Sequence, residues 1–73
     1  MNLKYAAALA KEHVCELFAA ENVRLESFLY DDHLMVWSLT IGFAPAGDSA
    51  DARVSKIVRV SESNKAVLSI RDP

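Results

Sequence analysis

The segment at residues 34–43 constrains the fold most, because large apolar side chains recur in it at every second position. Alternate residues of a β-strand point to opposite faces of the sheet, so this pattern places the whole apolar set on one side. The set predicts the core face of a central strand and consists of Met35, Trp37, Leu39, Ile41 and Phe43. Such a row requires a second layer to cover it.

Residues 3–20 supply that layer, because their spacing is that of an amphipathic helix. Asn2 precedes the helix as its expected N-cap, and Asn22 is expected to end it, since asparagine tolerates left-handed geometry. The apolar stripe consists of Leu3, Ala6, Ala7, Ala10, Val14 and Leu17. Its alanines allow the helix backbone to approach a sheet closely.

Three further strands and two turns are predicted from alternation and from turn-forming residues. The strands are residues 23–30, 53–60 and 66–71, and the turns are Asp31-Asp32-His33 and residues 62–65. Residues 44–51 predict a mobile loop, and Asn64 is expected at positive φ. The predicted fold is therefore a single domain, residues 1–73, of the α+β class: one N-terminal helix packed on an antiparallel meander of three to four strands.

One helix can cover only one face of this sheet. We expect the helix stripe to pack against Leu25, Trp37, Leu39, Ile41, Val58, Leu68 and Ile70. By parity, the opposite face, called the open face below, carries Arg24, Glu26, Phe28, Tyr30, Leu34, Val36, Ser38, Thr40, Arg53, Ser55, Ile57, Arg59, Val67, Ser69 and Arg71. This set is more apolar than a solvated face requires and is rimmed by arginines, as protein-binding patches are. The plain alternative is an ordinary exposed face of an antiparallel sheet.

The leading functional hypothesis is a small non-enzymatic bacterial protein-binding module that acts through the open face, as a homodimer or as an inhibitor or adaptor of another protein. The partner-binding residues predicted for it are Arg24, Phe28, Tyr30, Val36, Ile57, Arg59 and Arg71. The first alternative is a single-stranded nucleic-acid binder, in which the same arginines and aromatic side chains form a stacking platform. The net charge of −2 and the pI of about 5.5 argue against a phosphate backbone as partner.

The second alternative is a small metal-dependent enzyme or a metal site at Asp31, Asp32 and His33, which offer oxygen and nitrogen ligands. An acidic pair before a strand is more often a solvated turn. His13 and Cys15 are two positions apart on a helix, so their side chains diverge and cannot form a nucleophile–base pair. We therefore expect no enzyme and no cofactor.

The cellular location is predicted from three features: the N-terminal apolar run, the longest apolar stretch and the number of cysteines. The apolar run at residues 5–10 is shorter than a signal-peptide core, and the stretch of about 20 apolar residues that spans a membrane is absent from the sequence. The single cysteine, Cys15, suits a reducing compartment. A cytoplasmic protein is therefore expected.

The order of a helix followed by a meander resembles PepSY-type modules and some small bacterial immunity proteins. The resemblance lies in the end of the chain, where a valine strand (58–61), a polar turn and a second apolar strand (65–70) follow one another. This chain has Asn64-Lys65 where those modules carry a glycine, so we assign no family. The resemblance implies only a module that acts by binding.

Overall fold

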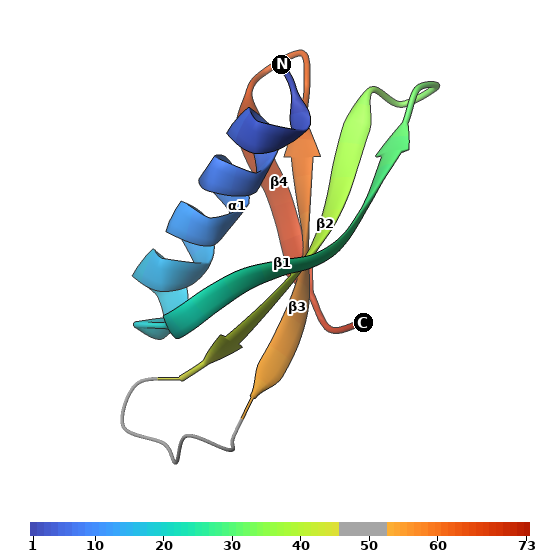
Figure 1. Cartoon of the computed structure of the whole chain (residues 1–73). Coiled ribbons are helices and arrows are strands. Elements are labelled where there is room, and N and C mark those ends of the chain that lie inside the picture. Colours follow the sequence, from blue (N-terminus) through green and yellow to red (C-terminus); the bar gives the residue numbers. More distant parts are fainter. Residues whose placement is uncertain (46–52) are drawn as a thin grey trace.

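The computed structural model describes residues 1–45 and 53–73. Helix α1 (Leu3–Phe18) precedes the strands β1 (Glu21–Asp31), β2 (Val36–Ala44), β3 (Val54–Ser61) and β4 (Ala66–Arg71). These strands form an antiparallel sheet in the order β1-β2-β3-β4, with α1 along one face (Figure 1). The predicted two-layer α+β fold is confirmed, with four strands among the described residues. The loop predicted at residues 44–51 lies, beyond Pro45, outside them.

The helix begins as predicted and ends earlier than predicted. The side-chain oxygen Oδ1 of Asn2 accepts a hydrogen bond from the Tyr5 amide at 2.9 Å, which satisfies one free first-turn donor. The helix stops at Phe18, and Ala19 takes the left-handed conformation with φ 49°. Asn22 also has a positive φ, of 53°, but it lies inside β1 and is not the helix cap.

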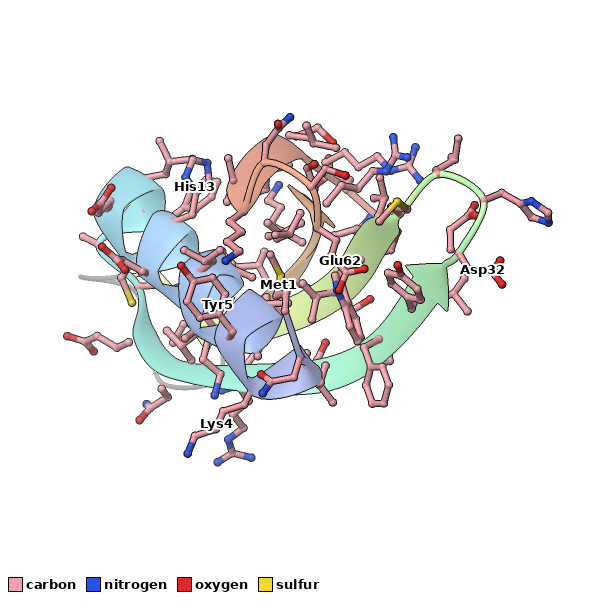
Figure 2. The ribbon with its side chains drawn as sticks, turned by 90° about the horizontal axis from the view of Figure 1, so that it is seen from above. Met1, Lys4, Tyr5, His13, Asp32 and Glu62 are labelled. Atoms are coloured by element: carbon pink, nitrogen blue, oxygen red, sulfur yellow. The ribbon has the colours of Figure 1, made fainter. Side chains whose placement is uncertain are left out.

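The core lies between the helix and the sheet, which curls around α1 (Figure 2). Its residues without any exposed surface are Ala6, Ala10, Val14, Leu39, Ile41, Phe43, Val58 and Val60. Small side chains on the helix and large ones on the sheet let the two layers pack closely, as the alanine stripe predicted. The ring of Phe18 stacks on Phe43 with centroids 5.2 Å apart, which closes the core near the end of α1.

A β-bulge in β1 changes the face to which its side chains point. Leu25 pairs with Ile41 and Ser27 pairs with Thr40, so Glu26 is an extra residue. Beyond it, Phe28 pairs with Leu39 and Tyr30 with Trp37. Directly paired residues of an antiparallel sheet share a face, so both aromatic side chains lie on the helix side. Their predicted position on the open face is wrong, because one inserted residue resets the alternation.

A bulge in β4 has the same effect. Arg59 pairs with Ser69 and Val60 with Val67, which leaves Leu68 as the extra residue. Val67 therefore packs against the core, whereas Leu68 is 51% exposed. The predicted positions of these two residues are exchanged. Leu17, also predicted in the core, is 55% exposed.

The two hairpin turns, at residues 32–35 and 62–65, have the same construction. The residue before each turn caps it: Asp31 Oδ1 accepts from the amides of His33 (3.0 Å) and Leu34 (3.1 Å), and Ser61 Oγ accepts from the Asn64 amide (3.2 Å). Each turn ends on a residue at positive φ, Met35 (55°) and Lys65 (52°). Met35 is thus a turn residue and not a core strand residue, and Lys65 holds the conformation predicted for Asn64.

Both turns lie at the end of the sheet that carries the N-terminus of α1 (Figure 1). The amide of Glu62 donates to the carbonyl of Met35 at 2.9 Å, so the backbones of the two turns are joined directly. The β1–β2 turn reaches away from the helix, as Asp32 shows in Figure 2.

Candidate functional site

The open face differs in chemistry from the one that strict alternation predicts. The register places Arg24, Val36, Ile57, Arg59 and Arg71 there, as predicted, and adds Leu29. Most of the remaining positions are small: Ser27, Ser38, Thr40, Gly42, Ser55, Ser61 and Ser69. Val36 is 6% exposed, whereas Leu29 is 69% exposed. On this face, accessible apolar surface is therefore concentrated on the edge strand β1 and not in the middle of the sheet.

Glu26 is held across β2 on the open face. Ser55 Oγ donates to Glu26 Oε1 at 2.6 Å, and β2 lies between the two strands. Gly42 makes this crossing possible, because a Cβ at that position would lie 2.6 Å from Glu26 Cδ. The charge of the bulge residue is thus engaged within the molecule and is turned toward the sheet.

An aromatic cluster occupies the helix side of the β1–β2 hairpin. The ring centroid of Trp37 lies 4.8 Å from that of Tyr30 and 6.4 Å from that of Phe28. Trp37 is half-buried, and its buried Nε1 has no hydrogen-bond partner among the residues that the structure describes. Phe28 remains 54% exposed. The cluster therefore extends the core to the sheet edge and leaves one aromatic ring accessible.

Tyr30 is fixed by a polar contact at its tip. Its hydroxyl donates to Glu62 Oε2, and the N-terminal amine of Met1 lies 3.5 Å from Glu62 Oε1 (Figure 2). The hydrogen bond to Glu62 is the main reason that the pKa of Tyr30 is raised above its ordinary value, and desolvation adds to it. This contact links β1 to the β3–β4 turn and to the start of α1.

Half of the eight exposed large apolar side chains of the described residues lie at the end of the β1–β2 hairpin. Four of them fall within residues 28–35: Phe28 (54%), Leu29 (69%), Leu34 (61%) and Met35 (44%). Phe28 and Leu29 point to opposite faces of β1, which is an edge strand. We call residues 27–31 of β1 the β1 edge. Strict alternation places Leu29 on the helix side, so it is not among the predicted partner-binding residues. The one sequence signal for its exposure is that Phe28, Leu29 and Tyr30 are consecutive apolar residues.

The residues considered for the alternative metal site form the β1–β2 turn and its cap. Asp31 caps it through two backbone amides, and Asp32 and His33 are exposed. Within residues 1–45 and 53–73, His, Cys, Asp and Glu form no group of three or more that could hold a metal ion. His13 is half-buried and lines a shallow groove between α1 and β4 with Leu9, Glu12, Glu16 and Val67, and Cys15 is exposed.

No protein-family model matches the sequence, and comparisons with curated proteins and with solved structures find no significant match. Among the described residues, α1 lacks the length and apolar character that crossing a bilayer requires.

Proposed function

We propose that this chain is a non-enzymatic protein-binding module that holds its partner through the β1 edge and the adjoining turn. The observation that carries this proposal is the exposure of two large apolar side chains on opposite faces of one edge strand, Phe28 at 54% and Leu29 at 69%. Large apolar side chains gathered on a small domain mark interaction sites more often than solvated surface.

An edge strand offers two kinds of contact at once. Among the described strands, none pairs with the outer side of β1, so an extended segment of a partner can add to it as a further strand. Its side chains then contact the partner on both faces of the enlarged sheet: Phe28 on the helix side and Leu29 on the open face. Arg24, Ile57, Arg59 and Arg71 share the open face with Leu29 and would supply a more polar rim.

The nucleic-acid alternative requires bases to stack on aromatic rings beside the arginines. Phe28 and Tyr30 lie on the helix side, whereas Arg59 and Arg71 lie on the open face, so the two halves of that platform are separated by the sheet. The protein-binding function is therefore preferred. The exposed thiol of Cys15 fits a reducing compartment, and we propose the cytoplasm as the location.

Affinity capture with three immobilised proteins tests the proposal: the wild type, Leu29→Lys and the matched control Leu68→Lys. Leu68 is 51% exposed on the other edge strand, so both lysines are added at accessible positions. We expect proteins retained by the wild type and by Leu68→Lys to be lost from Leu29→Lys, with unchanged circular dichroism. Equal retention by all three proteins would contradict a role for the β1 edge.

A further inference from the structure

We infer that the partner that fits the β1 edge is a second copy of this chain, joined by antiparallel pairing of β1 with β1 about a two-fold axis at Leu29. This inference rests on the proposed function, because it takes β1 as the binding edge. It extends that function by naming the occupant and the register.

The two edges of the sheet differ in how well they are protected against pairing. Natural edge strands are protected by short length, charge, proline or a bulge. β4 is short, at 6 residues, is interrupted by the bulge at Leu68, and ends in Arg71 shortly before Pro73. β1 has 11 residues, and both of its own register shifts, between Glu21 and Arg24 and at Glu26, precede the β1 edge, where the register with β2 is regular from Ser27 to Asp31. Residues 27–30 contain neither charge nor proline.

The β1 edge is complementary to itself in one register. When the two strands pair antiparallel with the two-fold axis at Leu29, the Leu29 side chains of the two copies lie opposite each other on the open face. The helix side pairs Phe28 with the second copy's Tyr30, and this aromatic pair occurs twice because of the two-fold symmetry. Every pair then joins residues that share a face in β1. Aromatic pairs of this kind are favourable cross-strand neighbours.

Neighbouring registers match less well. An axis at Phe28 would place Leu29 opposite Ser27, and an axis at Tyr30 would place Leu29 opposite Asp31. Each of those arrangements sets an exposed apolar side chain against a polar one. The axis at Leu29 instead sets Ser27 opposite Asp31, a hydroxyl donor facing a carboxylate acceptor.

Charged side chains flank the β1 edge at both ends. With Leu29 on the axis, Asp32 of one copy falls opposite Glu26 of the other, and Arg24 lies two residues beyond Glu26. The nearer carboxylate, Glu26, is engaged with Ser55 on the open face. Because the paired segment is short, we expect a small interface and a dimer that dissociates on dilution.

Cysteine cross-linking tests the register. In a Cys15→Ser background, which removes the native exposed thiol, we would compare Leu29→Cys with Leu68→Cys under mild oxidation. Directly opposed residues of paired strands have Cβ atoms about 4.5–5.5 Å apart, close to the span of a disulfide. We expect Leu29→Cys to form a disulfide dimer at least about tenfold faster than Leu68→Cys, which is also at an exposed position, because only position 29 meets its own copy.

Light scattering across a dilution series completes the test. The wild type should show a dimer that dissociates on dilution, and Leu29→Lys should be monomeric throughout. A wild-type protein that is monomeric at every concentration, or a dimer that persists in Leu29→Lys, would overturn the inference. If the wild type is monomeric but Leu29→Lys fails to retain the proteins that the wild type retains in affinity capture, the proposed function stands. Only a second copy of this chain is then excluded as the partner. If Leu29→Lys changes neither measurement, both fail.

Discussion

Replacing Gly42 with alanine tests whether a missing side chain at this position is needed for the Glu26 side chain to cross β2 and reach Ser55. Gly42 is buried in β2, and an added Cβ would lie 2.6 Å from Glu26 Cδ and 3.1 Å from Oε1. The atoms in the way belong to the end of a flexible side chain, so we expect Glu26 to move and the backbone to remain in place. The hydrogen bond from Ser55 Oγ to Glu26 would then be lost.

The expected magnitude follows from two opposing contributions. Losing an exposed hydrogen bond to the Glu26 carboxylate costs about 1 kcal/mol. Alanine in a strand interior is more stable than glycine by roughly 0.5–1 kcal/mol. Gly42→Ala should therefore change the free energy of unfolding of the wild type little, destabilising it by at most about 0.5 kcal/mol. In a Glu26→Ala background the same change should stabilise by roughly 0.5–1 kcal/mol.

Urea unfolding of the wild type, both single variants and the double variant, followed by circular dichroism, measures the coupling between the two positions. We expect a coupling energy of about 1 kcal/mol. If Gly42→Ala destabilises by the same amount with and without Glu26, the glycine serves the backbone and not the passage of the Glu26 side chain. Ser38→Ala, on the same face of β2, is the matched control and should show no coupling to Glu26.

Further predictions concern the core, the Tyr30 contact and the turns. Phe43→Ala should cost about 3–5 kcal/mol, as much as a core of this size supplies, so circular dichroism should show a largely unfolded protein; native spectra would refute the assigned core. Glu62→Gln should lower the pKa of Tyr30 toward its ordinary value, measured by tyrosinate absorbance, because a neutral amide can also donate to the tyrosinate oxygen, whereas the Glu62 carboxylate stabilises only the protonated hydroxyl; an unchanged pKa would show that Glu62 is not the main cause of its increase. Since the folded pKa is raised, this stabilisation is present below the unfolded pKa and is lost as the pH rises through the folded value. Lys65→Gly and Met35→Gly should each stabilise by about 1 kcal/mol in urea unfolding, because both residues have positive φ; destabilisation by either would show that its side chain matters more than its backbone.

The helix and the central strands could be predicted because each has a long regular pattern. The helix stripe and the row Trp37, Leu39, Ile41 and Phe43 all pack on the core in the structure, apart from Leu17. β1 and β4 could not be predicted in the same way, since a bulge breaks each pattern after a few residues. A signal exists: the apolar residues of β1 change from odd to even positions between Leu25 and Phe28. A change of parity within one strand is what an inserted residue produces.

The hairpin turns were only partly predictable for a related reason. Asp31 and Ser61 are residue types that cap turns with their side chains, and each stands before a turn of the same construction. Strand propensity extended β2 back to Leu34, because Leu34 and Met35 are apolar. In the structure, the side chain of Asp31 caps the turn by accepting from the Leu34 amide. Leu34 and Met35 therefore belong to the turn, and Leu34 is 61% exposed.

The bulge at Glu26 also decides which variant should weaken binding most. Under regular alternation, Ile57 would lie in an apolar open face together with Phe28 and Tyr30. With the bulge, Ile57 is half-buried beside Thr40 and Arg71, whereas Leu29 is 69% exposed at the edge. Leu29→Lys should therefore disrupt association more than Ile57→Lys when dissociation is compared by light scattering at equal helical content. The reverse order would return the binding surface to the middle of the open face, because an edge-pairing partner does not contact that position.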